Sequence, residues 1–468
     1  MPTYKTPGVY VEEITKLPPS IAEVETAIPA FIGYTENARL KEDGDLLNQP
    51  TKINSIFDYE RLFGKAQAEG DGAITITIEE NRDGSTTVQG KVDESKRSPY
   101  LMYYSMQAFF ANGGGPCYIV SVGDYSTGIV ARPNLEAGLA EVAKEDEVTL
   151  ILFPDGTNMT PTTDYYSLQK SALDQCVSLQ DRFVIMDVYA HNDIAINDVE
   201  VFRASDFGNK DVAKYGATYY PYLETGWDYQ FEADKVDILH VGGDGSLAGK
   251  LDALESKNNR FYNQALNAIN AISMVLPPSS SIAGIYAQVD AARGVWKAPA
   301  NVGVDNAIRP VVKITDLDQE DLNVDVTAGK SVNAIRSFTG RGPAIVWGAR
   351  TLAGNDLEWR YISVRRFFNM VEESVKKATV QFVFEPNDVN TWTRVKSMIG
   401  NFLNLQWRNG ALQGTTPEEA YFVKIGLNET MNQQDILEGR MIVEIGMAVV
   451  RPAEFIILRF SHKLLDES

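Results

Sequence analysis

The most regular pattern of apolar and polar positions lies in residues 338–384, where it predicts a turn, a strand, a loop, a helix and a second strand. Gly340, Gly342 and Pro343 indicate the turn, and the β-branched and aromatic residues of 345–352 favour the strand. Ser363 is placed to cap the helix that follows. The apolar stripe of this helix recurs at spacings of three and four: Val364, Phe367, Phe368, Val371, Val375 and Ala378.

The opposite side of this predicted helix is charged. Such a pattern is typical of a solvated face and, less often, of a docking surface. The residues concerned are Arg365, Arg366, Glu372, Glu373, Lys376 and Lys377.

Residues 100–222 alternate between helical and strand patterns, which favours a largely parallel sheet covered by helices. Helices are predicted over residues 100–111, 135–143, 166–179 and near 198–204, and strands over 29–34, 117–122, 148–153, 183–188 and 218–222. A helix is also expected over 55–63, where Gly64 ends it. Residues 65–98 differ, because two alternating runs around Asn81 to Gly84 predict an inserted β-hairpin at the outside of the molecule.

After residue 384, Asp388 is expected to cap a helix with an apolar face, and Thr416 begins a capping box with proline at the first helical position. A helix is predicted to end near Met274, before a double proline. Residues 316–325 are predicted as an acidic loop. Strands over 441–450 and 454–460 are predicted to pair with each other at the end of the chain.

The first twenty residues contain a short β-prone run but too few apolar side chains for a core of their own. Such an extended segment suits strand addition to the edge of a sheet, on its own subunit or on a neighbour. The alternative is a frayed terminus.

The composition indicates a globular chain of two or three domains, since it has 468 residues, 44% hydrophobic and 23% charged. The net charge of −20 argues against a nucleic-acid binder, whose phosphate contacts need clustered Lys and Arg. Residues 290–468 hold 21 Lys and Arg against 22 Asp and Glu, whereas residues 1–289 hold 22 against 41. The start of the chain does not resemble a signal peptide, so we expect assembly in the cytoplasm and no direct membrane insertion. Cys117 and Cys176 are expected to be buried thiols.

Several long motifs resemble the contractile tail sheath proteins of phage tails, R-type pyocins and other contractile injection systems. They are GRG at 340–342, VWGARTL at 346–352, EWRYISVRR at 358–366 and RPAEF at 451–455. The segments at 7–13, 109–122, 217–224 and 275–301 are also similar to this family, although Gln288 stands where the family pattern has Arg. The similarity weakens over residues 65–98 and about 224–257, which we interpret as insertions.

The resemblance implies a multidomain α/β and α+β fold. The expected parts are an N-terminal arm and linker (1–28), an α/β middle domain (29–64 and 99–330), the β-rich insertion (65–98) and a C-terminal α+β sheath domain (331–468). It also implies a structural protein without cofactor or metal. Many copies would assemble helically around an inner tube, with baseplate and terminator or cap proteins as further partners.

Two sets of site residues follow from this hypothesis. The two ends of the chain are expected to supply strands to neighbouring copies: Gly8, Val9, Tyr10, Val11, Glu12 and Glu13, and Glu454, Phe455, Ile456, Ile457, Leu458, Arg459 and Phe460. A tube contact has to break during contraction, so screened charges suit it better than a large apolar surface. The candidate tube contacts are Arg394, Lys396 and Arg408.

The alternative function is a nucleotide-binding α/β enzyme that uses the glycine-rich loop from Gly243 to Ala248. The loop fits a relaxed dinucleotide fingerprint, but it does not open the domain. Residues 249–250 lack the flanking residues of a phosphate-binding loop, 316–327 lacks the glycine and glutamate of a calcium loop, and 112–115 follows a helix instead of preceding one. His191, His240 and His462 are isolated from metal-ligand spacings. A monomeric binding module is a third possibility.

Overall fold

The computed structural model describes residues 20–189 and 195–459, which form two compact units. The large unit contains Glu25–Met370 and residues 451–459, and the small unit contains residues 20–24 and Val371–Val450. The chain therefore crosses between the units at residues 24–25, 370–371 and 450–451. These units have different bounds from the predicted domains.

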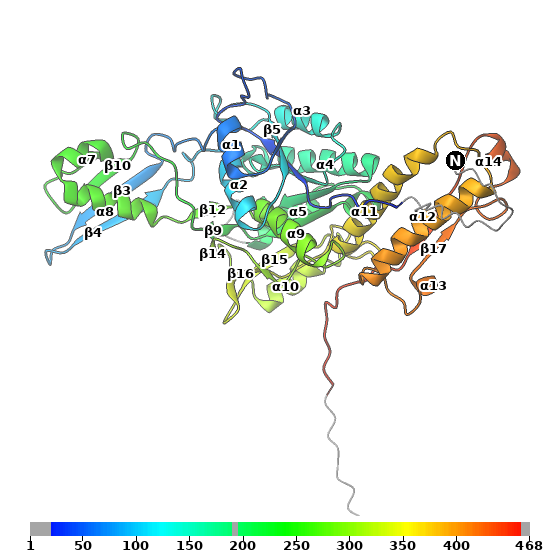
Figure 1. Cartoon of the computed structure of the whole chain (residues 1–468). Coiled ribbons are helices and arrows are strands. Elements are labelled where there is room, and N and C mark those ends of the chain that lie inside the picture. The colour runs from blue at the N-terminus through cyan, green and yellow to red at the C-terminus, as the bar shows by residue number, and fades with distance from the viewer. Residues whose placement is uncertain (1–19, 190–194, 460–468) are drawn as a thin grey trace, which may run out of the picture. The chain divides into compact units, whose positions relative to one another are not determined.

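A nine-stranded sheet organises the large unit (Figure 1). Its central strands run parallel, as the alternation of helices and strands predicts. In spatial order the strands are β13 (Val302–Gly303), β16 (Gly342–Val346), β15 (Asn333–Phe338), β8 (Gly216–Tyr220), β7 (Phe183–Asp187), β6 (Leu150–Leu152), β1 (Pro29–Gly33), β5 (Cys117–Ser121) and β2 (Thr51–Ile53). The residues of β15 and β16 fall within the range 331–468 that was assigned to the C-terminal domain, and they belong to this sheet.

Helices cover both faces of this sheet and create two hydrophobic cores. Helices α2 (Met102–Ala111) and α9 (Ser279–Arg293) pack on one face, and α3 (Arg132–Val142), α4 (Thr162–Leu179) and α5 (Ala195–Ala204) pack on the other. All five residues of β1, β5, β7 and β8 are buried, as expected for strands covered on both sides. Cys117 and Cys176 are free and buried, as predicted.

The two suspected insertions form one sheet together. The predicted hairpin is present as β3 (Ile74–Glu80) and β4 (Thr86–Val92), and β3 also pairs in parallel with β10 (Asp237–Val241), which pairs with β11 (Gly249–Lys250). Helices α7 (Leu251–Lys257) and α8 (Asn259–Asn270) cover the side that carries Ile74, Ile76 and Ile78. Segments about 160 residues apart in the chain therefore share one core.

Shorter elements complete the large unit. They are α1 (Ile56–Phe63), α6 (Lys210–Ala213), α10 (Asp316–Asn323), a 3₁₀ turn at Gly156–Asn158, and a three-stranded sheet of β12 (Met274–Leu276), β9 (Leu223–Thr225) and β14 (Ala307–Pro310). Gly64 ends α1, as predicted, whereas Ser55, which the prediction placed inside the helix, is its N-cap and accepts a hydrogen bond from the N–H of Asp58.

The small unit contains the second half of α11 (Ile362–Thr379), a 3₁₀ turn at Val380–Phe382, α12 (Val389–Arg408), α13 (Pro417–Ala420) and α14 (Gln433–Leu437). Its two-stranded sheet pairs β17 (Tyr421–Lys424) with β18 (Glu444–Met447). Asp388 accepts a hydrogen bond from the N–H of Thr391 and caps α12, as predicted.

Several local predictions are wrong. Residues 380–382 form a 3₁₀ turn and residues 383–384 a further turn instead of a strand, and Ser363 lies buried inside α11 instead of capping it. The acidic segment predicted as a loop is helix α10, because Thr315 and Asp318 form a capping box. The helix predicted to reach Met274 ends at Asn270.

Two predictions near the end of the chain are also wrong in detail. Helix α13 begins where predicted, but Glu419 accepts its hydrogen bonds from Thr415, so Thr416 forms no capping box. Strand β18 pairs with β17, and residues 454–459 form no strand in this chain.

Two buried carboxylates join the carboxyl edge of the large sheet to helix starts. Asp155 accepts hydrogen bonds from the N–H groups of Tyr34, Leu101 and Met102, and Asp187 accepts one from the N–H of Ser279 at 2.8 Å. Burial raises the pKa of each to about 7, although these hydrogen bonds act in the opposite direction.

These raised pKa values predict that the protein loses stability as the pH rises. A carboxyl whose pKa is higher in the folded state binds more protons there than in the unfolded chain, so the free energy of unfolding falls from about pH 4 to pH 7. For Asp187 the expected loss is about 2 kcal/mol between pH 5 and pH 7. The variant Asp187→Asn should reduce this slope in urea unfolding curves at stepped pH; an unchanged slope would contradict the prediction.

Candidate functional site: the roots of the two terminal segments

The terminal segments were predicted to reach other copies, so the positions where each joins the large unit form the candidate site. Residues 8–13 lie outside the described part of the chain, whereas Glu454 to Arg459 lie within it, and Phe460 lies outside. We call residues 25–28 the N-root and residues 451–454 the C-root.

The C-root is held by an ion pair whose arginine is buried and whose glutamate is partly exposed. Arg350 donates to both carboxylate oxygens of Glu454, with Nε to Oε1 at 2.9 Å and Nη2 to Oε2 at 2.6 Å. Asn323 donates to Oε1 at 2.8 Å and the Tyr361 hydroxyl to Oε2 at 3.2 Å. Only 3% of the Arg350 side chain is exposed, so this bidentate pair lies in a poorly solvated environment. It fixes the chain at Glu454.

The pKa of Glu454 reflects this arrangement. Burial alone would raise it, but the hydrogen bonds from Arg350 and Asn323 outweigh burial and hold the pKa below its usual value. The carboxylate therefore stays charged at neutral pH, as the Arg350 contact requires. Arg451 adds a further hydrogen bond from Nη1 to the carbonyl oxygen of Leu357 at 2.8 Å.

Beyond Glu454 the segment has little contact with the rest of the chain. Residues 455–459 run away from the large unit in extended form (Figure 1). Phe455, Ile456, Ile457 and Leu458 are each at least 70% exposed. Four consecutive exposed apolar residues are unusual on a protein surface. They indicate a segment that binds to another protein surface.

The N-root is held by a second buried arginine. Arg366 pairs with Asp290, and its Nη2 donates to the carbonyl oxygen of Thr26 at 2.9 Å. The Thr26 hydroxyl donates to Oδ2 of Asp290 at 2.6 Å. The guanidinium of Arg366 also lies 4.5 Å from the ring centroid of Tyr286.

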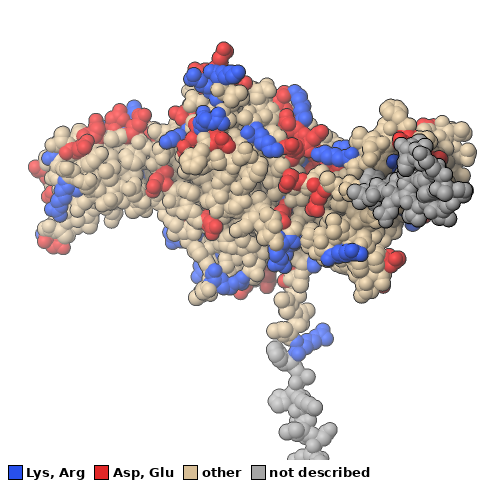
Figure 2. All heavy atoms as spheres, in the orientation of Figure 1, with Lys and Arg blue, Asp and Glu red and all other residues tan. Residues whose placement is uncertain are grey.

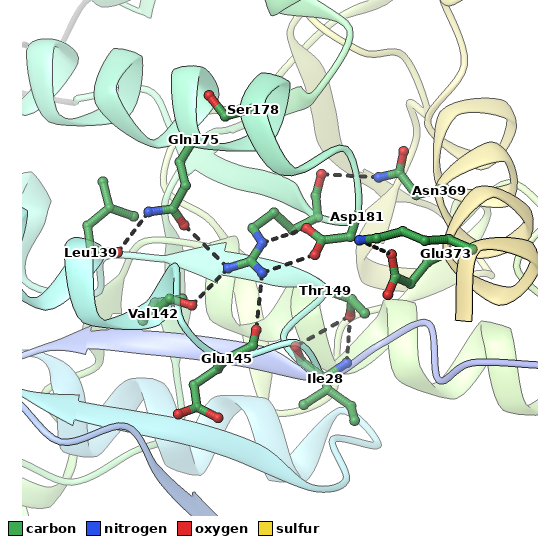
Figure 3. Close-up of polar contacts among 12 residues, drawn as sticks. Ile28, Leu139, Val142, Glu145, Thr149, Gln175, Ser178, Asp181, Asn369 and Glu373 are labelled. Carbon is green, nitrogen blue, oxygen red and sulfur yellow. Dashed lines mark hydrogen bonds and ion pairs between the residues drawn. The ribbon is translucent and has the colours of Figure 1, made fainter. Parts of the chain in front are cut away.

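Thr149 fastens the next residues of the N-root. Its hydroxyl donates to the carbonyl oxygen of Thr26 at 2.9 Å. It also accepts from the N–H of Ile28 at 2.8 Å (Figure 3). Strand β1 begins immediately afterwards at Pro29. The N-terminal segment therefore leads directly into the central sheet.

A third buried arginine joins α11 to the sheet layer. Arg182 donates to the carbonyl oxygens of Val142 and Glu145 and pairs with Asp181 (Figure 3). Its own carbonyl oxygen accepts from the side chain of Asn369 on α11. This contact holds the part of α11 that lies in the large unit.

The predicted solvated face of α11 is therefore wrong for its first turns. Only 2% of Arg365 and of Arg366 is exposed. The guanidinium of Arg365 lies 4.4 Å from the Trp359 ring and 5.0 Å from the Tyr215 ring, while its Nε donates to Asn369. Aromatic stacking and hydrogen bonds thus replace water around both charges.

The candidate tube contacts all lie exposed on α12. Arg394 is 55% exposed, pairs with Glu385 at 3.6 Å and lies over the Phe382 ring. Arg394 and Arg408 are fourteen residues apart, or about four helical turns, and so share one side of the helix. Lys396 lies on a different side, because two residues turn the helix by about 200°.

The glycine-rich loop does not form a nucleotide site. Residues 243–248 connect two antiparallel strands, β10 and β11, and are mostly exposed. A dinucleotide fingerprint instead places this loop between a strand and a helix N-terminus. His240 contacts Glu80 at 3.2 Å, and within residues 20–189 and 195–459 no group of His, Cys, Asp and Glu is arranged to hold a metal ion. In the same ranges no helix is long and apolar enough to cross a membrane.

The family resemblance of the motifs agrees with the comparisons to known proteins. The profile of the phage tail sheath C-terminal domain matches residues 355–463. The tail sheath protein of Burkholderia phage BcepMu is 30% identical over 160 residues, which cover 33% of this chain and 32% of that protein. The chain thus spans about a third of the length of this phage relative.

Solved structures match over the whole chain. The sheath of the extracellular contractile injection system PVC, in its contracted state, is 30% identical, with 99% of both chains covered and a TM-score of 0.65. The contracted helical sheath of the anti-feeding prophage is 29% identical over 98% of this chain and 100% of that chain, with a TM-score of 0.64. The chain belongs to the contractile tail sheath family.

Sequence reasoning identified the motifs but not their contacts. Arg350 of VWGARTL, Tyr361 of EWRYISVRR and Glu454 of RPAEF meet in one cluster. Their separations of 93 and 104 residues follow no spacing rule. The sequence indicated the Arg350 and Glu454 contact only in that the motifs contain residues of opposite charge.

Proposed function

We propose that this protein is the sheath subunit of a contractile injection particle. Copies assemble helically around an inner tube on a baseplate, and the sheath shortens to drive the tube through a target membrane. The full-length similarity to the PVC sheath in its contracted state carries this proposal. A head-to-tail contact that does not close into a ring generates such a helical assembly.

The terminal segments supply the connections between copies in this proposal. Residues 8–13 and 454–460 add strands to sheets of neighbouring copies, so that backbone hydrogen bonds persist while the bodies repack. The alternating side chains from Phe455 to Leu458 are apolar on both sides of such a strand, which suits a strand covered on both faces. The ion pair of Arg350 and Glu454 would transmit force from this strand to the large unit.

The acceptor we propose is the sheet of β17 and β18. Among the described residues it has two strands, and a two-stranded sheet is marginally stable alone. Val423 is buried on this sheet, and the Tyr421 hydroxyl donates to the carbonyl oxygen of Gly400 on α12, so one face is already covered. Strands added at its outer edges would complete the sheet.

We further propose that α12 faces the inner tube. Arg394 and Arg408 share its exposed side and provide charges that salt and water screen. Contacts of this kind separate more easily than a desolvated apolar surface. On the face drawn in Figure 2, Lys and Arg side chains are interspersed with Asp and Glu side chains.

Electron microscopy of assembled particles tests this function. We expect long and short sheath forms in preparations without added nucleotide, because the extended assembly stores the free energy that contraction releases. A strict requirement for ATP would contradict the proposal. A shift in thermal stability on addition of NAD or ATP would instead favour the enzyme hypothesis.

A further inference from the structure

The loop between α11 and α12 exposes an apolar surface in the small unit. Val380, Val383, Phe384 and Val389 are all at least 60% exposed, and Phe384 is fully exposed. We call these four residues the Phe384 patch. Four large apolar side chains within ten residues are more than scattered surface exposure accounts for.

The loop that carries this patch is firmly held. Phe382 is buried, and Asn387 accepts from Trp392 Nε1 at 2.7 Å and donates to the carbonyl oxygen of Arg440 at 3.0 Å. Phe384 itself has φ of +70°, a left-handed conformation that is sterically unfavourable for a bulky side chain. An exposed aromatic side chain in a strained backbone conformation adds no buried contact that would stabilise the fold. We therefore infer that Phe384 serves an intermolecular contact.

We propose that the Phe384 patch binds a second copy of this chain within the assembled sheath, an inference that rests on the proposed function. The inner tube is the less suitable occupant, because the tube must slide free of the sheath and desolvated apolar contacts resist separation. Copies of the sheath subunit stay joined throughout contraction. An aromatic side chain that becomes buried in the interface therefore suits the permanent contact between copies.

The chain offers a complementary apolar surface beside its C-root. Val326 is 90% exposed and Leu357 is 73% exposed. Arg451 donates to the carbonyl oxygen of Leu357, and Asn355 donates to that of Asp325, so both residues lie next to the point where the C-terminal segment departs. Residues 455–460 span at most about 20 Å. If this segment pairs with the sheet of a neighbouring copy, Val326 and Leu357 therefore lie near the small unit of that copy. The geometry points to Val326 and Leu357 as the surface opposite the Phe384 patch.

The variant Phe384→Asn separates assembly from folding. Asn tolerates φ of +70° better than Phe, so the urea midpoint of the purified chain should stay equal or rise. The chain concentration needed to form sheaths, measured by sedimentation and electron microscopy, should rise at least tenfold. Phe57→Asn is the matched control, because Phe57 is 77% exposed on α1 in the large unit, and it should assemble as the wild type does. Val326→Asn should raise the required concentration as Phe384→Asn does.

Other outcomes would overturn this inference. Normal assembly of Phe384→Asn would remove the patch from the interface, while the wild-type sheaths in the same experiment would leave the proposed function intact. Normal sheaths that fail to retain the inner tube would identify the tube as the occupant. A lowered urea midpoint would assign Phe384 to folding. Failure of the wild type itself to assemble would instead count against the proposed function.

Discussion

Deletion of residues 2–16 is expected to give a folded chain that cannot polymerise. This deletion removes the predicted arm strand at residues 8–13 but keeps Thr26 and Ile28, whose contacts with Arg366 and Thr149 hold the N-root. The urea midpoint should therefore stay within error of the wild type. Sedimentation should show only the small species at concentrations where the wild type forms sheaths.

A chain that ends at Phe460 serves as the control for this deletion. It loses only the polar tail of residues 461–468 and keeps the predicted C-terminal strand. We expect it to assemble normally. Sheaths of normal length from the chain without residues 2–16 would defeat the assignment of the N-terminal arm.

Replacement of Arg366 by Leu is expected to cost the large unit about 3–5 kcal/mol of unfolding free energy. The substitution leaves the Asp290 carboxylate buried without its cation and removes the donor to Thr26. It also removes the cation that lies over Tyr286. Urea denaturation followed by tyrosine and tryptophan fluorescence measures the loss.

Two further variants make the Arg366 result specific. Arg394→Leu removes an exposed ion pair and should cost less than about 1 kcal/mol. Asp290→Asn combined with Arg366→Leu should be less destabilising than the sum of the single changes, because neither partner is then left charged and alone. If Arg366→Leu and Arg394→Leu lower the unfolding free energy by the same amount, the prediction for the buried pair of Arg366 and Asp290 is contradicted.

Predictions that depended on residues close in the sequence were confirmed more often than predictions that depended on distant residues. The Asp388 cap, the end of α1 at Gly64, the hairpin of β3 and β4 and the parallel order of the central strands follow from local chemistry and periodicity. Such signals are present within a few residues of the element that they define.

Predictions failed where distant groups decide the outcome. The charges of Arg365 and Arg366 were assigned to solvent because the pattern of a helix contains no information about Tyr215, Trp359 or Asp290. The pair of Arg350 and Glu454 forms across 104 residues, and no spacing in the sequence indicates it. The candidate site consists mainly of such long-range pairs, so the motifs indicated its residues but not its geometry.

The shared core of the two insertions constrains how this family diverges. Strand β3 lies between β4 and β10, and α7 and α8 cover its row of isoleucines. A lineage that lost only the first segment would leave the second without its central strand, and loss of the second alone would leave Ile74, Ile76 and Ile78 in water. The two segments are therefore expected to be inherited or discarded together, although more than a hundred residues separate them in the gene product.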